Sequence, residues 1–429
     1  MELACASILH VADERIRILD LKTILPSIQA ALFQSLKPTL EASPSIHPAP
    51  ASSPEISATF SRALGRVITV LDHGGPSSRQ FAWDAMKDFC EQMRAGMTQF
   101  ETSYGSVEAW DRQKIMLFAF LHPASSILRI LLLDDRAPHA STRDMGIEVL
   151  FTLASFVEVV DGSQGGVEGY DKVFYGCIDV LAARGGSFGV KRLFDRLFEE
   201  AEMSAAKSSF VLLVTEKLIH YLDVILIGRV LSICERYINQ PQHRRSFEAT
   251  HALLLALIGS ASGSPVADGA SHQGDFLEEM VQYYPDILLK QTRDGDITND
   301  ELRQAYSLII QAASRRTPFS VYRCVHLIDV HELLAKDAEL LQTLRLIRIS
   351  IAPFIPPSAL PVYLDDLAKR IMELETDLPQ RLELSALAFK MVIEELPDVS
   401  KRLGIEWWLD WRDRFEGRIG SSTKSKARL

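Results

Sequence analysis

The chain has 429 residues, 47% of them hydrophobic, and its 46 Lys and Arg against 56 Asp and Glu give a formal net charge of −10. This apolar content excludes a mostly disordered chain, and the acidic balance argues against a nucleic-acid-binding protein, which normally carries a basic stripe. The length allows two or three compact domains, or one elongated array of repeats.

The cysteines are Cys5, Cys90, Cys177, Cys234 and Cys324. They are too few and too scattered for a disulfide framework, and no two of them form a CxxC pair. We therefore expect a protein of a reducing compartment that has no zinc or redox site. The sequence likewise indicates no cofactor.

The N-terminal residues do not have the pattern of a secretory signal, because Glu2 comes first and no basic region precedes the short apolar run. We also expect no segment with the roughly 18 uncharged apolar residues that a membrane-spanning helix needs. The best candidate, residues 210–231, contains Glu216, Lys217 and Asp223, which would be costly in lipid.

Apolar residues recur at spacings of three and four almost throughout the chain, which predicts helices, and no alternating strand pattern is convincing. Residues 60–71 and 301–313 show such stripes, and Thr298 and Glu301 fit a capping box after the turn at Asp294. Further helix starts are expected near Ser141, Ser187, Ser208, Pro241 and Pro379.

About fifteen antiparallel helices in succession are expected, and such a string usually stacks as hairpins that bury their apolar faces on one another. No fixed repeat period is visible, and the tetratricopeptide and ankyrin signatures are absent. The predicted fold class is therefore all-α, an irregular α-solenoid of antiparallel helical hairpins that are HEAT- or armadillo-like.

Two segments of turn-forming composition divide this array. Residues 41–56 are rich in Pro, Ser and Ala and are expected to be a linker, and residues 259–274 a flexible loop. The expected organisation is an N-terminal helical segment 1–40, the linker 41–56, a first half of the array 57–258, the loop 259–274, a second half 275–419 with a Trp-rich last helix, and a disordered tail 420–429.

One fragment begins like the zinc motif HExxH. His331 and Glu332 supply its first two residues, but Ala335 stands where the second histidine is needed, and His326 is turned away from that helix face. A structural histidine is the better interpretation, so no metal-binding residue is predicted.

A second fragment begins like a calcium-binding loop. Asp294 and Asp296 fit its first positions, but Asn299 replaces the required glycine and Ala305 the bidentate glutamate. We interpret it as a turn and helix cap. Since no catalytic motif is complete either, we expect a protein that is not an enzyme, although active sites built from scattered residues stay open.

The segment 405–415 carries three of the five tryptophans. Trp407 and Trp411 share one helix face, and Trp408, Trp411 and Phe415 share another. One interpretation is an aromatic cap that closes the solenoid. The other is a partner anchor, because Trp and Arg dominate the energetics of protein interfaces.

The chain closes with Ala427-Arg428-Leu429, the small–basic–leucine form of a type-1 peroxisomal targeting signal. A receptor for such a signal captures the free carboxylate, seats the small residue in a tight slot, pairs the cation with an acidic patch and buries the leucine. The preceding tail, with Lys424 and Lys426 among small polar residues, predicts an accessible signal. A chance match is the alternative.

An all-helical array without catalytic motifs that ends in Ala427-Arg428-Leu429 resembles the fungal intraperoxisomal peroxin, the eighth of that set. The resemblance implies a peripheral protein on the lumenal side of the peroxisomal membrane or in the matrix, attached through other proteins. It further implies binding to the targeting-signal receptor, bridging of the docking and ubiquitin-ligase subcomplexes, and a role in cargo release. The spacing of Trp411 and Phe415 also fits the diaromatic peptides used in peroxisomal import.

Two other interpretations remain. The first is a cytosolic or nuclear helical-repeat scaffold whose last three residues match by chance. The second is a peroxisomal matrix enzyme of unfamiliar helical fold, which predicts a deep pocket lined by titratable groups with shifted pKa values. A scaffold predicts instead an extended groove or an aromatic patch.

Overall fold

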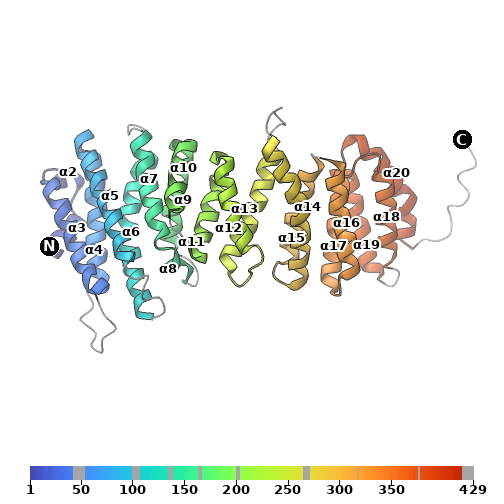
Figure 1. The fold of residues 1–429 in the computed structure, drawn as a ribbon, viewed down its shortest axis with the longest axis horizontal. Coiled ribbons are helices and arrows are strands. Elements are labelled where there is room, and N and C mark those ends of the chain that lie inside the picture. Colours follow the sequence, from blue (N-terminus) through green and yellow to red (C-terminus); the bar gives the residue numbers. More distant parts are fainter. Residues whose placement is uncertain are drawn as a thin grey trace, which may run out of the picture. The chain divides into compact units, whose positions relative to one another are not determined.

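The computed structural model describes residues 1–41, 54–98, 107–133, 139–162, 167–199, 203–263, 271–315, 317–374 and 377–417. In these residues the chain forms twenty α-helices, a few short 3-10 or π-helical turns, and no strand (Figure 1). The predicted all-α class is confirmed, whereas the HEAT- or armadillo-like class stays a prediction. The helices outnumber the expectation partly because three of them have only four to seven residues, too short to leave a periodic pattern.

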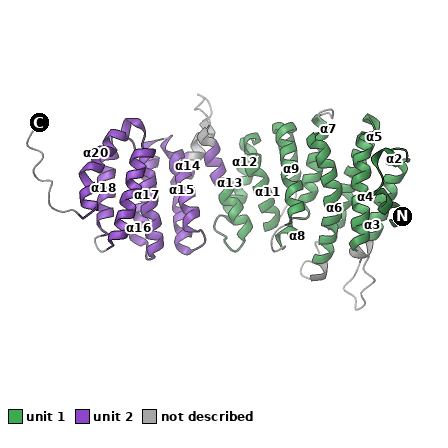
Figure 2. Cartoon of the chain, turned by 180° about the vertical axis from the view of Figure 1, so that it is seen from behind, with its two compact units in different colours: residues 1–253 green, residues 254–429 purple. Residues whose placement is uncertain are grey.

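The chain forms two compact units, residues 1–253 and 254–429 (Figure 2). The boundary falls inside α13 (Arg244–Gly263), and α14 (Ser271–Asp294) follows. Helix therefore occupies both ends of the expected loop 259–274, and residues 264–270 lie outside the described residues. Similarly, α3 (Leu21–Glu41) and α4 (Pro54–Asp72) reach into the expected linker 41–56 from both sides.

Stacked helices build the first unit. Besides α3, α4 and α13, its elements are α1 (Glu2–Ile8), α2 (Asp13–Ile16), α5 (Pro76–Thr98), α6 (Val107–Leu133), α7 (His139–Ala154), α8 (Val157–Asp161), α9 (Glu168–Arg184), α10 (Gly186–Leu197), α11 (Ala205–Lys217), the 3-10 turn Ile219–Tyr221 and α12 (Val224–Tyr237). Next-but-one helices lie against each other, α4 against α6 and both α5 and α9 against α7. This is the packing of helical hairpins in an array.

A row of aromatic rings runs through the core of the first unit. Phe33, Phe89, Phe120 and Phe156 follow one another with ring centroids 5.6, 6.2 and 5.7 Å apart. These rings come from α3, α5, α6 and the turn before α8. Because aromatic pairs at this separation add to the free energy of burial, the row ties successive helices into one continuous core.

Among the described residues, one helix segment, Trp110–Leu133 in α6, is long and apolar enough to cross a membrane by length and composition alone. The best candidate is therefore this segment and not residues 210–231, although Arg129 interrupts its uncharged run. The segment is 61% buried over its apolar window, and α6 packs against α4 and α9. That burial is typical of a core helix, which needs apolar residues all round.

The N-terminal helices are attached to α4 by one arginine. The Arg66 guanidinium donates hydrogen bonds to the carbonyl oxygens of Ile8, Leu9 and Val11 and pairs with Asp13 at 3.0 Å. The carbonyls at the end of a helix lack partners within it, so a side chain from a neighbouring helix satisfies them here. The N-terminal segment thus packs directly on the array, through α1, α2 and α3 against α4.

Changing Arg66 to lysine should weaken this attachment. A lysine ammonium group cannot reach the four acceptors that the planar guanidinium group of Arg66 contacts. Losing hydrogen bonds to a charged group costs roughly 1.5–3 kcal/mol, so amide hydrogen exchange in α1 and α2 should become about tenfold faster or more. The control is Arg62→Lys, since Arg62 bonds only to Ala58 of its own helix. Equal exchange rates in both variants would show that Arg66 does not hold the segment.

The second unit repeats the stacked arrangement. After α14 its elements are α15 (Asn299–Ser314), α16 (Pro318–Leu334), α17 (Ala338–Ile351), the 3-10 turn Ala352–Phe354, α18 (Leu360–Met372), α19 (Leu378–Lys390), the π-helical turn Met391–Glu395 and α20 (Asp398–Phe415). Here α14 packs against α16, α15 against α17 and α18 against α20. The unit is therefore also built of two layers of helices.

The sequence located several of these helices well. The stripes 60–71 and 301–313 lie within α4 and α15. The starts expected near Ser141, Ser187 and Pro379 fall within two residues of the observed ones, whereas α11 begins three residues before Ser208 and α13 three residues after Pro241. The turn before α15 also forms, with Gly295 at a φ of 86° that favours glycine.

The capping box is confirmed: the Thr298 side chain accepts from the Glu301 N–H, and the Glu301 side chain accepts from the Thr298 N–H. Replacing Thr298 by alanine should cost about 1 kcal/mol, which lowers the melting temperature of a unit of this size by roughly 2–4 °C. Ser307→Ala, at an exposed position inside the same helix, should leave it unchanged or slightly raised. A Thr298→Ala protein that melts like Ser307→Ala would contradict the role of the cap.

Candidate protein-interaction site

The structure brings the four predicted aromatic residues of α20 together. Phe415 lies 6.1 Å from Trp407, 5.8 Å from Trp408 and 6.1 Å from Trp411, measured between ring centroids. Phe389 of α19 joins them, 4.9 Å from Trp408. We call these five residues the aromatic cluster. Its rings are held by two helices, so their orientation is set by packing rather than by α20 alone.

Local sequence explains how α20 approaches its neighbours. Gly404 faces the π-helical turn, where a Cβ atom would collide with the side chains of Leu396 and Val392. A glycine therefore lets α20 lie close to that turn. At the other end of the helix, the Arg381 side chain donates to the Phe415 carbonyl oxygen at 3.0 Å and satisfies one of the last carbonyls.

The members of the aromatic cluster differ in exposure. Phe415 is fully buried and Trp407 is 6% exposed, whereas Trp408 and Trp411 are half-buried. The indole N–H of Trp411 donates to Asp365 at 3.2 Å, and the Arg414 guanidinium lies 4.7 Å from its ring. As folded, Trp411 and Phe415 are thus not presented together as a free diaromatic peptide. Trp408 and Trp411 are the more accessible members of the aromatic cluster, and Phe415 and Trp407 are its buried members.

An exposed apolar surface adjoins the aromatic cluster, and sequence reasoning missed it. We call it the α19–α20 face. Its residues are Leu378, Leu382, Ala386, Phe389 and Ile393 from α19 and the π-helical turn, and Ile405, Trp408 and Leu409 from α20. The spacing of the α19 residues marks one helix stripe, which could have been found, but a stripe does not reveal whether another helix covers it.

The fragment that begins like HExxH has a structural role. His331 is buried, and its Nε2 lies 3.1 Å from a carboxylate oxygen of Asp286 on α14. Burial raises the pKa of Asp286, but hydrogen bonds from Lys290 and His331 outweigh this and lower it. No group of three or more His, Cys, Asp and Glu side chains that could hold a metal ion occurs in the described residues.

Glu332 belongs to a buried ion-pair network. Arg348 of α17, which is 1% exposed, pairs with Glu332 and Asp329 of α16, and Arg370 of α18 pairs with the same two carboxylates. Asp366 of α18 completes the network, 3.2 Å from Arg348 and 2.8 Å from Arg370. These charges join three helices and explain why acids and arginines recur in this part of the sequence.

The cysteines show no reactive environment. All five are buried and form no disulfide. Burial raises the pKa of the Cys90, Cys234 and Cys324 thiols to about 12. A thiol is a poor nucleophile and metal ligand until it loses its proton, so these side chains behave as apolar core residues.

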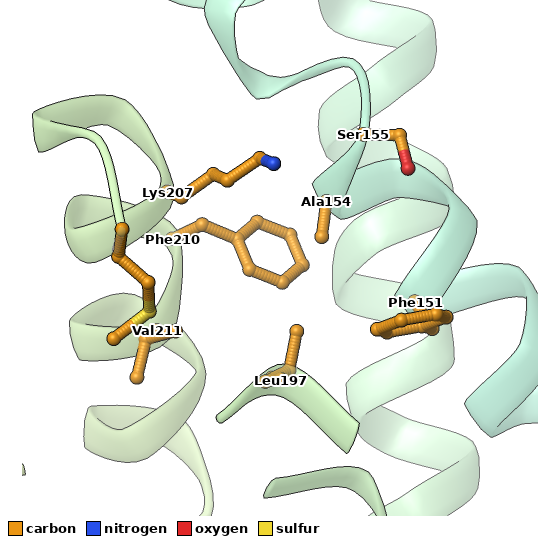
Figure 3. A pocket seen from close by; sticks show the side chains of 8 residues that line it. Phe151, Ala154, Ser155, Leu197, Lys207, Phe210 and Val211 are labelled. Atoms are coloured by element: carbon orange, nitrogen blue, oxygen red, sulfur yellow. The ribbon is translucent and has the colours of Figure 1, made fainter. Parts of the chain in front are cut away.

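A small pocket lies between α7, α10 and α11 (Figure 3). Its lining residues are Phe151, Ala154, Ser155, Leu197, Met203, Lys207, Phe210 and Val211. Its volume is about 20 Å³, room for about one water molecule, which is far too small for a metabolite. Beside it, Arg94 and Arg196 both pair with Glu148 and lie over the Phe151 ring. We read this pocket as a packing defect between helices.

The predicted targeting signal Ala427-Arg428-Leu429 lies outside the described residues, as does the whole expected tail 420–429. Its geometry therefore adds nothing to the sequence argument. The described residues form an aromatic cluster, an apolar face and a structural ion-pair network. They also line two larger open hollows, one of about 800 Å³ beside the turn at Gly295 and one of about 430 Å³ among the N-terminal helices.

Stacked helical hairpins define an all-α, repeat-like architecture. Comparison with protein families is more specific: the model of the PEX8 central TPR-like domain matches residues 188–259. Over these residues the chain resembles the peroxin PEX8. The match to a TPR-like domain thus falls in a region where the sequence shows no tetratricopeptide signature.

Two further comparisons add little. No curated protein matches the sequence. Among solved structures, a circular tandem repeat protein with novel repeat topology and enhanced subunit contact surfaces is similar, with 12% sequence identity and a TM-score of 0.37 over 95% of this chain and 98% of that one. The family match covers α11, α12 and most of α10 and α13, and it includes Leu197, Lys207 and Phe210 of the small pocket.

Proposed function

We propose that this chain is a non-enzymatic peroxisome biogenesis factor that acts inside the organelle, on the lumenal face of its membrane or in the matrix. The match of residues 188–259 to the PEX8 central TPR-like domain carries the proposal. The Ala427-Arg428-Leu429 ending supports it, because a type-1 signal is an address for the peroxisomal interior. Two independent parts of the chain thus point to one organelle.

The tail supplies a simple mechanism for cargo release. A receptor pocket that reads the carboxylate, the cation and the leucine of a cargo protein reads Ala427-Arg428-Leu429 in the same way. Once inside the organelle, the tail competes with cargo for that pocket, and cargo leaves by mass action. A shared site of this kind shifts the receptor between two bound states without any catalytic step.

In this proposal the two helical units connect the subcomplexes of the import machinery. Each compact unit presents its own surface, so one chain holds the docking subcomplex and the ubiquitin-ligase subcomplex at once. Trp408 and Trp411 serve as partner anchors, because they are half-buried and held from beneath by Trp407 and Phe415. Preorganised aromatic side chains lose little entropy on binding. Attachment to the membrane then runs through the bound proteins.

The test is the import of a fluorescent marker that ends in Ser-Lys-Leu, in cells that lack the chain and in cells that re-express it. The proposal predicts a cytosolic marker without the chain and a peroxisomal one after re-expression. A matrix enzyme would leave import intact while one metabolic activity disappears, and a cytosolic or nuclear scaffold would change neither. Normal import in the absence of the chain contradicts the proposal.

The receptor-binding step is tested with purified proteins. The full chain should displace a labelled Ser-Lys-Leu peptide from the targeting-signal receptor, whereas the chain without residues 427–429 should not. Leu429→Glu is the matched variant that keeps the length and the free carboxylate, and it should compete at least about tenfold more weakly, since a charge cannot enter the apolar pocket. Equal competition by the full and the shortened chain would rule out the shared-site mechanism.

A further inference from the structure

An apolar hollow opens among α1, α2 and α3 of the first unit, and its volume is about 430 Å³. Each helix contributes aliphatic side chains to its wall, among them Ile8 of α1, Ile16 of α2, and Ile24 and Ile28 of α3. Among the described residues, no charged side chain lines it. The wall thus has the composition of a protein core, although it faces an open space.

The hydroxyl groups in this wall already donate within their own segments. Ser7 donates to the Leu3 carbonyl oxygen at 2.8 Å. Thr23 donates to the Asp20 carboxylate at 2.7 Å, and Ser27 to the Thr23 carbonyl oxygen at 2.9 Å. The side chains of the wall therefore keep no hydrogen-bond donor for an occupant. A polar group moved into such a place loses its water without a replacement, whereas a hydrocarbon gains by leaving water.

Large apolar side chains at the hollow remain in contact with water. Met1 and Leu19 line it and are 60% and 46% exposed. Leu3 and Ile18, which stand beside lining residues in the sequence, are 85% and 83% exposed. An occupant of the hollow removes Met1 and Leu19 from water and gains the free energy of their burial.

From this lining we infer that the hollow binds the hydrocarbon chain of a single-chain amphiphile, a fatty-acyl ligand whose polar head stays in water. A methylene group takes roughly the 30 Å³ that a water molecule takes in the liquid, so the hollow has room for a chain of roughly ten to fifteen carbons. Two chains of that length do not fit.

A helix from a partner protein fits the hollow less well. Two turns of helix, ~10 Å across and ~11 Å long, fill roughly 850 Å³. This is about twice the volume of the hollow, so such a helix inserts only a few side chains. A single hydrocarbon chain, in contrast, is covered over most of its surface, as ligands of concave apolar sites are.

The exposed charges of residues 1–28 are balanced. Asp13 pairs with Arg66 at 3.0 Å. The others are three acids and three bases: Glu2, Glu14, Asp20, Arg15, Arg17 and Lys22. This balance gives no net attraction for an anionic or a cationic head group. The ligand is therefore recognised by its chain.

Isothermal titration calorimetry of the full chain tests this site, with dodecanoate and dodecyltrimethylammonium below the concentrations at which they form micelles. Two temperatures are needed, because the heat of apolar burial passes through zero near room temperature. Both ligands should bind once per chain, with dissociation constants within about threefold of each other. Each pair of carbons removed, as in decanoate and octanoate, should weaken binding by about tenfold, since fewer methylene groups leave water.

Two variants test whether the ligand lies in the hollow. Ala4 is exposed and lines the hollow, so Ala4→Glu sets a carboxylate in it and should weaken the binding of dodecanoate by about tenfold or more. Ala30→Glu, at an exposed position of α3 away from the lining, is the matched control and should change nothing. Ser27→Leu fills the hollow and should weaken binding without lowering the melting temperature, because the Ser27 hydroxyl donates within its own helix.

Absence of binding below the micelle concentrations would overturn the assignment. Binding that Ala4→Glu and Ser27→Leu both leave unchanged would place the ligand elsewhere, and binding of one head group alone would show that charge is recognised instead of the chain; either result contradicts the assignment. If neither ligand binds but Ala4→Glu blocks import of the marker, the hollow is a docking site for a protein.

Such a site does not depend on the peroxisomal role. A chain that binds dodecanoate in the hollow but leaves marker import intact would keep the site and remove the proposed function. A chain that is required for import but binds neither ligand would do the reverse.

Discussion

Replacing Arg348 with methionine is expected to lower the melting temperature of the second unit by roughly 10 °C. The guanidinium is 1% exposed and pairs with Asp329, Glu332 and Asp366. Removing this guanidinium leaves the three carboxylates to Arg370. Breaking a buried ion pair costs about 3–5 kcal/mol, and each kcal/mol shifts the melting temperature of a unit of this size by ~2–4 °C. Burial alone lowers the pKa of Arg348, but Tyr363 and the carboxylates outweigh it and raise it, so the charge is permanent.

Two further variants make this result specific. Arg402→Met removes an arginine whose side chain is 88% exposed and pairs with Glu406 within α20, and it should leave the melting temperature unchanged. Glu332→Gln, added to Arg348→Met, should recover part of the loss, because it removes a buried carboxylate that has lost one of its two arginine partners. A loss of less than about 2 °C for Arg348→Met alone would mean that the three helices are held together by apolar packing and not by these charges.

Replacing Phe415 with alanine is the second large effect. Phe415 is fully buried and contacts the rings of Trp407, Trp408 and Trp411. Truncating a buried phenylalanine costs about 3–5 kcal/mol. The emission of the tryptophans should shift to longer wavelength, since three of the five belong to this cluster and lose the ring that packs against them.

Trp408→Ala separates stability from binding. Trp408 is only half-buried, so its removal should lower the stability much less than Phe415→Ala while still weakening the binding of a partner that contacts the aromatic cluster. Phe319→Ala, at a position that is 64% exposed on α16, is the control for both measurements and should alter neither. If Phe415→Ala melts like Phe319→Ala, the aromatic cluster does not fasten α20 to the unit.

Periodicity predicted the helices well where they are long. The stripes in α4 and α15 and the capping box at Thr298 could be read directly, because each depends on residues three or four positions apart. The short helices α1, α2 and α8 left no such pattern. The burial of α6 could not be predicted from the sequence either, because it depends on contacts with α4 and α9, which are distant in sequence.

The candidate site shows the same difference between local features, which the sequence predicts, and contacts between helices, which it does not. The α20 aromatic residues were found because they are local, but their unequal burial depends on α18, α19 and the π-helical turn, which no single helix pattern reveals. Likewise, the residues around Glu332 suggest part of a zinc motif, because its partners Arg348 and Arg370 lie on other helices and are not part of the local pattern. The α19 stripe was readable, but whether it is covered is a property of the folded chain and not of the helix.

The central claim is that this chain enters the peroxisome and serves import there. Its most direct test is the location of an N-terminally tagged chain, with and without Ala427-Arg428-Leu429, in cells that carry a peroxisomal marker. We expect the tagged chain to overlap with the marker in a punctate pattern, and this overlap to be lost when the three residues are removed. Overlap that survives their removal would mean that a partner carries the chain in, which still fits an import factor. A diffuse signal from both forms would contradict the account and leave a helical scaffold that acts elsewhere.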